Sequence, residues 1–522
     1  MSAELVEGQS TPDEAQLNKA FRRNFNKNAN VYIPGLVSIA RAALSGPFEE
    51  NASLAASISI LAAGAFNKVF LLSFPASGSS DVATNIVARI PWDDGTARHA
   101  ARLRSQLASI MFARSIFAPK ASAQLLDHAE GDIAAVPRVL GFSVDASNAA
   151  KAPYMLLEHC KGVHLGPSEW DQCSWKEKAH VVSLVARTWA KMAKPIDVTG
   201  NKSLEGMGSL DFSLGAASVE GPLVFKVVPM LSPQNGLMSG QEEPAQIHLR
   251  IIDLWRNRVE QELKVIDERW PEGAESTVVY EGYGSDDPSR HLSDLQLLGD
   301  QLRRLIAQAD DFSTVRLGSG VSLLHQDFSF WRNMLFSSDK MQVTGVLDWD
   351  DAIVVPRFLL ARYPEELTHQ ARWRIDPTDV WAVPVDVEEE EVGMVEAAIE
   401  ETRLRAEFRS EVTKQDPELG AMFEDEALQS LRNLHEVILG GWEEWLVRSH
   451  WIAGETEKQI REAIDEFGVQ QKSEPEPKFR FGVRKKKVST TTIMITVCGR
   501  VVDSASRDFV PSPNLKCKVL SQ

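Results

Sequence analysis

Two neighbouring stretches decide the fold of this chain: LLHQDFSFWRNMLF at residues 323–336 and VTGVLDWDDA at residues 343–352. Each stretch contains a short apolar run of the kind that forms a strand. Asp327 follows an apolar run and lies in a predicted loop, Asn333 ends that loop, and Asp348 ends the next apolar run. A hairpin-like arrangement of these segments would bring the three side chains together.

Carboxylate and amide oxygens in this arrangement suit phosphoryl transfer. The reaction needs a group that orients or deprotonates the attacking hydroxyl, and oxygen ligands for the Mg²⁺ that bridges the phosphates. Mg²⁺ prefers hard oxygen ligands and keeps several waters, so one carboxylate and one amide oxygen suffice. The alternative is that Asp327 and Asn333 only shape a turn and that Asp348 caps a helix. The added His325 and the flanking apolar runs favour the functional interpretation.

The composition is that of a large soluble protein. The chain has 522 residues, 43% of them hydrophobic and 25% charged, which allows an extensive core. We find neither an apolar stretch of about 18 residues nor a signal-peptide pattern, which predicts a cytoplasmic protein without a membrane partner. A net charge of −17 argues against nucleic acid as the main partner.

The four cysteines show no metal-ligand spacing. None forms a CxxC pair or has a histidine partner at suitable spacing, so free thiols in a reducing compartment are expected. These cysteines are Cys160, Cys173, Cys498 and Cys517.

The coarse order of elements changes along the chain. Apolar, β-prone runs and one helix-period segment predict an antiparallel sheet carrying one helix. The runs are 68–74, 83–90, 136–142 and 154–158, and the helix is 99–117. Later segments have helical spacing: 175–194, 246–270, 293–310, 396–409 and 424–449. Residues 195–243 are rich in Gly, Ser and Pro and predict a loop-rich insertion.

The motif residues resemble a known family. His325, Asp327, Asn333 and Asp348 follow the pattern His-Gly-Asp-x-x-x-x-Asn and Ile-Asp-Trp of the aminoglycoside phosphotransferase and choline kinase-like family, which is related to the protein kinases. Further resembling stretches are GAFNKVF at 64–70, VARIP at 87–91, VPRV at 136–139 and PYMLLE at 153–158. Gly208-Ser-Leu210 and Pro356 are placed as in uncharacterised fungal-type members. The similarity covers roughly residues 55–450, a two-lobed kinase-like length.

The resemblance implies an α+β, two-lobed protein kinase-like fold, with a small antiparallel β-sheet N-lobe carrying one main helix and a larger helical C-lobe. The implied domains are a partly helical leader at 1–54, a nucleotide-binding N-lobe at 55–160 and a catalytic, acceptor-binding C-lobe at 161–470. A linker and basic tail at 471–522 are expected to be disordered.

The resemblance also implies ATP and Mg²⁺ as cofactors, and a role for each site residue. Asp327 would be the catalytic base with His325 as its support, and Asn333 and Asp348 would be the metal ligands. Arg89 would place a cation on the phosphates, a role usually given to Lys. The expected remaining nucleotide contacts are Gly64, Phe66, Gln106, Glu158, His159 and Cys160, the last three forming the hinge.

Two departures from the family pattern bear on catalysis. Five residues, not four, separate Asp327 from Asn333, and we expect a bulge on the Asp327 side to absorb the extra one. Gln106 stands where the family has the acid that pairs with the phosphate-binding cation. A neutral partner would hold Arg89 more weakly, because charged hydrogen bonds are about twice as strong.

Two functions from different classes follow. The first is an ATP- and Mg²⁺-dependent kinase acting on a hydroxyl of a small molecule, with no obligate protein partner. Acids such as Asp350, Asp351 or Glu365 could attract a cationic acceptor, although acids on helices are mostly solvated. The alternative is a catalytically impaired pseudokinase that serves as a binding or scaffold module. A protein kinase is disfavoured, since neither a Gly-x-Gly-x-x-Gly loop nor an Ala-Pro-Glu segment is present.

Overall fold

The computed structural model describes residues 31–44, 57–63, 67–75, 84–91, 97–117, 136–199, 201–213, 224–231, 246–276, 288–316, 320–367 and 392–458. The chain divides into two units, residues 1–457 and 458–522, and every described residue except Lys458 lies in the first. The predicted tail at 471–522, the first thirty residues of the leader, and Gly64 and Phe66 lie outside the described residues.

A five-stranded antiparallel sheet forms the N-terminal part, with strand order β1-β2-β3-β5-β4. Its strands are β1 Ser57–Ala63, β2 Asn67–Phe74, β3 Thr84–Pro91, β4 Val139–Ser143 and β5 Tyr154–Glu158. Alternate residues of β3 are buried, which is the period of a strand with one covered face. Arg89 is therefore on the face opposite Ile86, Ala88 and Ile90. The four predicted runs are confirmed, whereas β1 was not predicted.

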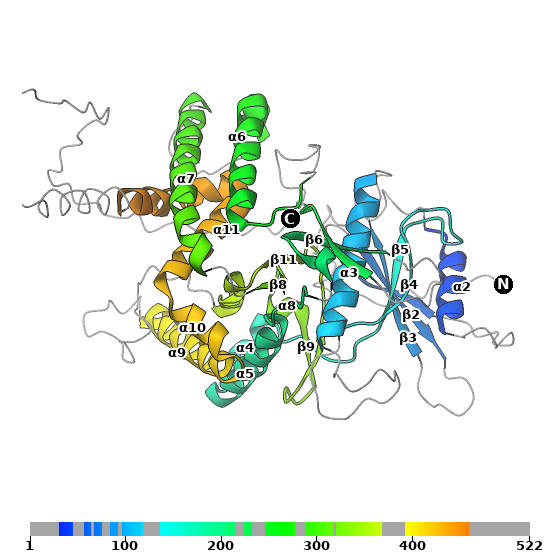
Figure 1. Ribbon diagram of the computed structural model, residues 1–522. Coiled ribbons are helices and arrows are strands. Elements are labelled where there is room, and N and C mark those ends of the chain that lie inside the picture. Colours follow the sequence, from blue (N-terminus) through cyan, green and yellow to red (C-terminus); the bar gives the residue numbers. More distant parts are fainter. Residues whose placement is uncertain are drawn as a thin grey trace, which may run out of the picture. The chain divides into compact units, whose positions relative to one another are not determined.

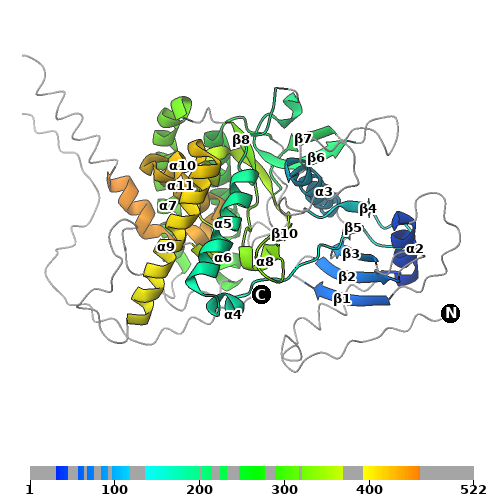
Figure 2. The ribbon, with the colours of Figure 1, turned by 90° about the horizontal axis from the view of Figure 1, so that it is seen from below.

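Two helices cover this sheet on opposite faces. Leu36 and Ala40 of α2 (Ile33–Leu44) join Phe70 and Leu72 in one buried cluster. The other helix, α3 (Ala97–Phe117), confirms the predicted helix and joins Met155 and Leu157 in the second cluster, on the face that carries Arg89. Figures 1 and 2 show α2 beside β4 at the edge of the sheet.

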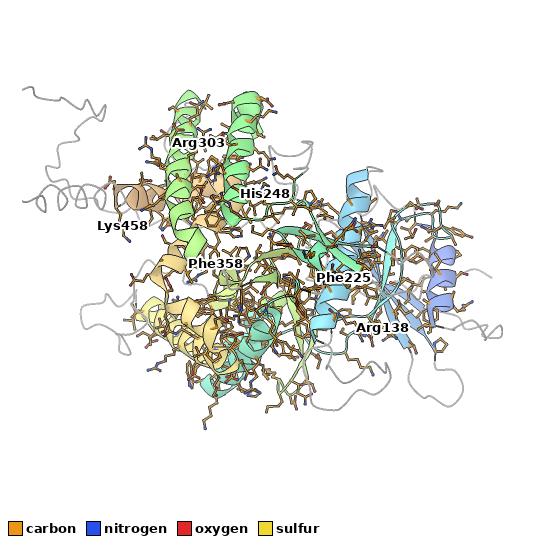
Figure 3. The ribbon with its side chains drawn as sticks, viewed as in Figure 1. Arg138, Phe225, His248, Arg303, Phe358 and Lys458 are labelled. Atoms are coloured by element: carbon orange, nitrogen blue, oxygen red, sulfur yellow. The ribbon has the colours of Figure 1, made fainter. Side chains whose placement is uncertain are left out.

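Helices dominate the rest of the chain. They are α4 Pro167–Asp171, α5 Trp175–Met192, α6 Ile251–Ser276, α7 Pro288–Arg316, α9 Val392–Gln415, α10 Pro417–Glu424 and α11 Glu426–Val447. A capping box of Ser174 and Glu177 begins α5. Figure 2 shows α5 and α9 side by side. In Figure 3, Arg303 marks α7, where its guanidinium donates two 2.7 Å bonds to Glu260 of α6.

Short strands form two further sheets in the part of the chain that follows β5. One sheet has the order β7-β6-β11-β8, and β10 pairs with β9. The strands are β6 Gly208–Ser213, β7 Val224–Val228, β8 Val321–Leu324, β9 Met334–Phe336, β10 Val343–Val346 and β11 Ile353–Pro356. Short 3₁₀ turns lie at η1 Lys202–Leu204, η3 Arg357–Leu360 and η4 Glu365–Leu367.

The loop-rich insertion predicted at 195–243 is partly wrong, since it contains β6 and β7. The sequence signal was weak because β6 obtains its second neighbour from β11, more than a hundred residues later. Phe225 of β7, labelled in Figure 3, packs edge-on against Phe112 of α3 with ring centroids 5.2 Å apart. These strands thus attach to the helix that covers the Arg89 face of the five-stranded sheet.

The predicted fold class is confirmed: an antiparallel sheet with one main helix precedes a larger helical part, as in a two-lobed protein kinase-like α+β fold. We call the two parts the N-lobe and the C-lobe. Among the described residues, no helix combines the length and apolarity that crossing a membrane requires.

Candidate active site

Arg89 of β3 meets two carboxylates from the C-lobe segment between β10 and β11. Its guanidinium lies 2.7 Å from Asp350 Oδ2 and 3.2 Å from Asp348 Oδ1. Burial lowers the pKa of Arg89, but the charges of Asp350 and Asp348 outweigh it and raise the pKa above the usual value. The strand cation therefore stays charged and faces the predicted metal ligand.

Asp350 collects donors from three N-lobe elements. Besides Arg89, its Oδ2 accepts Asn67 Nδ2 of β2 at 3.2 Å and Gln106 Nε2 of α3 at 2.9 Å. Gln106 thus lies at the site, bound to the same oxygen as Arg89. Burial, opposed by the Arg89 charge, raises the pKa of Asp350 to about 6. Asp350 lies in a turn and is largely buried, so it is not a solvated acid on a helix.

Asp348 begins this turn in a left-handed backbone conformation, with φ at 58°. The preceding residue, Leu347, is held from both sides. Its N–H donates to Asn333 O at 2.7 Å, and its carbonyl accepts His325 Nε2 at 2.9 Å. Burial lowers the pKa of His325, which keeps the ring neutral with a proton on Nε2. His325 and Asn333 therefore fix the backbone on which Asp348 stands.

Asn333 is 2% exposed, and its Oδ1 has no hydrogen-bond partner within the described residues. A buried oxygen without a partner is costly unless a ligand completes it. The half-exposed Asp348 has one oxygen engaged by Arg89. Asn333 and Asp348 thus fit a Mg²⁺ ion that keeps most of its waters. No cluster of three or more His, Cys, Asp or Glu suited to a metal occurs in the described part of the chain.

The loop between Asp327 and Asn333 contains one turn of helix, α8 (Phe330–Asn333). This turn was not predicted, and it lies on the Asn333 side of the loop. The bulge expected on the Asp327 side stays a prediction. Ser329 caps the turn by accepting the Arg332 N–H. Glu366 accepts both the Ser329 hydroxyl and the Trp331 N–H, the latter at 3.0 Å. Asn333 then leads directly into β9, as predicted.

Asp327 is the most accessible acid of the motif, with 68% of its side chain exposed. Arg332 binds it at 2.9 Å and also reaches Glu365 at 2.6 Å. The pair lies in solvent, where such contacts contribute only up to about 1 kcal/mol. Asp327 can therefore exchange Arg332 for another partner at little cost.

The predicted hinge follows β5. Glu158 pairs in the sheet with Ile86 and lies 3.8 Å from Arg114, while His159 and Cys160 leave the sheet. Burial raises the pKa of the Cys160 thiol to about 11, so it carries no charge at neutral pH. Beyond it, Val163 exchanges two backbone hydrogen bonds of 2.9 Å with Phe336 of β9. The hinge is thus attached to the strand that follows Asn333.

The strand order and the placement of the helices are those of a two-lobed protein kinase-like fold. No family model matches the chain. A subtelomeric hrmA-associated cluster protein of Aspergillus fumigatus, in two strains, is 23% identical over 343 residues. The match covers 60% of this chain, which spans about three fifths (61%) of the length of these relatives.

Several solved structures have a similar arrangement. Aminoglycoside phosphotransferase APH(2'')-Ib with ADP bound is 13% identical, with 77% of this chain and 90% of that chain covered and a TM-score of 0.36. APH(2'')-IIa with streptomycin and ATP is 13% identical, with 77% of this chain and 91% of that chain covered and a TM-score of 0.34. APH(3'')-Id of Streptomyces rimosus is 12% identical, with 79% and 99% covered and a TM-score of 0.30. These scores are low, and the fold class rests on the strand order and helix placement described above.

The sequence did not predict the contacts that three residues make around the site: Asn67, Glu366 and Asp350. Asn67 directly follows the predicted nucleotide-covering turn, which was its only signal. Glu366 lies more than thirty residues from the loop it supports. Asp350 stands next to the recognised Asp-Trp pair, but its partners are 244 to 283 residues away. Only the packed chain brings these residues to the site.

Proposed function

We propose that this chain is an ATP- and Mg²⁺-dependent phosphotransferase that moves the γ-phosphate to a hydroxyl group of a small molecule. The observation that carries the proposal is the contact of Arg89 with Asp348, whose neighbour Leu347 is bonded to the backbone of Asn333. The buried Oδ1 of Asn333 has no hydrogen-bond partner among the described residues. A fixed cation and two oxygen ligands are what binding a metal–nucleotide complex requires. The proposal includes lobes at 55–160 and 161–470 and a cytoplasmic location.

Each residue has a distinct role in this proposal. Asp327 accepts the proton of the acceptor hydroxyl, which its exposed position permits. Arg89 binds phosphate oxygens, and the hinge at Glu158, His159 and Cys160 binds the adenine. His325 acts through Leu347, as a support. Mg²⁺ held by Asn333 and Asp348 would supply neutralising charge at the phosphates. Gly64 and Phe66 are proposed to cover the nucleotide.

Thermal melting with Mg-ATP tests the proposal, using the wild type and Asp348→Ala. At 100 times the dissociation constant, binding stabilises the folded state by about 2.7 kcal/mol, which raises the melting temperature by a few degrees. The rise should require Mg²⁺ and should vanish in Asp348→Ala. Asp267→Ala is the matched control, since Asp267 lies on the surface of α6 and binds Gln296. A wild type that shows no shift at any Mg-ATP concentration contradicts the proposal.

A pseudokinase is the second candidate, and one contact favours it. Arg332 engages Asp327, the proposed base, and Glu365 holds Arg332 there. A protein that binds Mg-ATP but releases no ADP with any hydroxyl acceptor would be such a module. Release of ADP that depends on an acceptor and on Asp327 would instead establish the enzyme. A panel of small hydroxyl compounds, cationic amines included, separates the two and identifies the acceptor class.

A further inference from the structure

We infer that Asp350 is a positioning residue that supplies the charge holding Arg89, in place of an acid on α3. The inference rests on the proposed function for what Arg89 does with nucleotide, but the pairing itself is independent of it. Asp350 Oδ2 accepts Arg89 at 2.7 Å, Gln106 at 2.9 Å and Asn67 at 3.2 Å. One oxygen therefore ties β3, α3 and β2 to the C-lobe.

Two carboxylates contact Arg89, and their geometry assigns them different tasks. The bond to Asp350 is 0.5 Å shorter than the bond to Asp348, and Asp350 is the more buried acid, with 16% of its side chain exposed against 49%. Shorter charge-assisted bonds in less polar surroundings are stronger. Arg89 can therefore give up Asp348 to a metal ion and remain anchored by Asp350.

The identity of residue 106 agrees with this division. Gln106 donates an N–H to the oxygen that Arg89 binds. Glutamate here would place a second carboxylate against Asp350, and two like charges at that distance disfavour each other. An amide instead adds a hydrogen bond. The neutral Gln106 is therefore compatible with an acid at position 350. Arg89 still has a charged partner, which is Asp350 and not a residue of α3.

The arrangement also links the two lobes. The donors lie on the sheet and its helix, and the acceptor lies in the turn between β10 and β11. Removing the charge at 350 would leave the guanidinium of Arg89, whose side chain is 13% exposed, with the longer bond to Asp348 as its one ion pair among the described residues. Removing one partner of a buried ion pair is strongly destabilising, because the remaining charge stays buried without compensation. Both the orientation of Arg89 and the attachment of the lobes should suffer.

Isothermal titration with Mg-ATP tests the assignment by moving the charge. We expect Asp350→Asn to weaken binding about tenfold, which corresponds to about 1.4 kcal/mol. Gln106→Glu alone should also weaken it, whereas adding Gln106→Glu to Asp350→Asn should restore affinity to within about threefold of the wild type. Asp267→Asn is the control: Asp267 is exposed on α6 and accepts Gln296 Nε2 at 3.0 Å, away from these acids in the sequence. Its affinity should stay within about twofold.

Urea unfolding without nucleotide separates this inference from the proposed function. In a double-mutant cycle of Arg89→Gln and Asp350→Asn, Asp350→Asn lowers the free energy of unfolding. This loss should be at least twofold smaller when Arg89 is already replaced. This measurement remains decisive if the wild type binds no Mg-ATP, a result that would sink only the proposed function. Two results would overturn the role of Asp350. One is that the losses of unfolding free energy caused by Arg89→Gln and Asp350→Asn are additive. The other is that Gln106→Glu does not restore Mg-ATP binding to the Asp350→Asn variant.

Discussion

The carboxylate of Glu366 accepts a 3.0 Å hydrogen bond from the backbone N–H of Trp331, inside the loop that joins Asp327 to Asn333. The same carboxylate accepts the hydroxyl of Ser329, which caps α8. These bonds hold the helical turn of α8 in place. The turn ends at Asn333, so Glu366 supports the backbone that leads to this residue.

Replacing Glu366 should therefore loosen the loop. We expect Glu366→Ala to lower the free energy of unfolding by about 1–3 kcal/mol, because it leaves the Trp331 N–H without its acceptor. Glu365→Ala is the matched control, since Glu365 is exposed and binds only the surface residue Arg332 in the described part of the chain. Its effect should stay below about 1 kcal/mol. Urea unfolding measures both, and equal losses would show that Glu366 has no special role.

The partnerless oxygen of Asn333 leads to a prediction about Mg²⁺. Asn333→Ala should raise the Mg²⁺ concentration for half-maximal ATP binding by at least about tenfold. A tenfold change corresponds to a loss of about 1.4 kcal/mol in the free energy of Mg²⁺ binding. Without nucleotide the free energy of unfolding should change by less than about 1 kcal/mol, because the lost oxygen has no partner among the described residues.

Asn201→Ala provides the opposite pattern as a control. Asn201 donates to Phe225 O at 3.0 Å and caps η1. Its loss should lower stability while leaving the Mg²⁺ dependence of ATP binding unchanged. An unaltered Mg²⁺ dependence in Asn333→Ala would remove Asn333 from the metal site.

Acid should destabilise the C-lobe through His435. Its Nδ1 accepts the Trp255 indole N–H at 2.9 Å, and burial, together with the nearby Arg362 charge, lowers its pKa to about 3. In the unfolded chain His435 binds a proton near pH 6.5, whereas in the folded protein it stays neutral down to about pH 3. The contribution of His435 to stability is therefore fully present above pH 6.5 and decreases as the pH falls toward 3. At pH 5 the loss from this residue reaches about 2 kcal/mol.

Urea unfolding between pH 7 and pH 5 checks this expectation. His435→Gln keeps an acceptor for Trp255 but cannot titrate, so the fall in its free energy of unfolding should be smaller than in the wild type by about that amount. The same fall in both proteins would show that His435 does not carry the pH dependence.

The connection after the hinge tolerates no side chain at Gly162. A Cβ there would lie 2.2 Å from Thr344 Oγ1 and 2.9 Å from Leu335 Cβ, in a backbone with φ at 156°. We expect Gly162→Ala to cost about 1–3 kcal/mol by overpacking and to weaken Mg-ATP binding by displacing the hinge. Gly393→Ala, where a Cβ meets nothing within 4 Å, should change stability by less than about 1 kcal/mol. Calorimetry that gives both variants the same melting temperature would contradict this.

Much of the N-lobe could be predicted because its signals are local. Period-2 burial in β2 and β3 follows directly from their alternating side chains, and α3 has the length and spacing of a helix. β6 and β7 were missed because the Gly-, Ser- and Pro-rich residues around them resemble a loop. Their stability comes from β11 and α3, neighbours that are distant in sequence. The helical turn of α8 was missed for a similar reason, since Glu366 supports it from outside the motif.

The sequence by itself determined the order of His325, Asp327, Asn333 and Asp348, because these residues lie within 24 positions on adjacent short strands and their loop. The strand and helix periods also predicted an antiparallel sheet with one helix and a helical part after it, and the resemblance of the motif implied the two-lobed kinase-like fold class. Only the tertiary structure decided which acid holds Arg89. Asp350 meets Asn67, Arg89 and Gln106 across separations of 283, 261 and 244 residues. Local periodicity tells which face a side chain occupies, whereas partners this far apart are chosen by how the lobes pack.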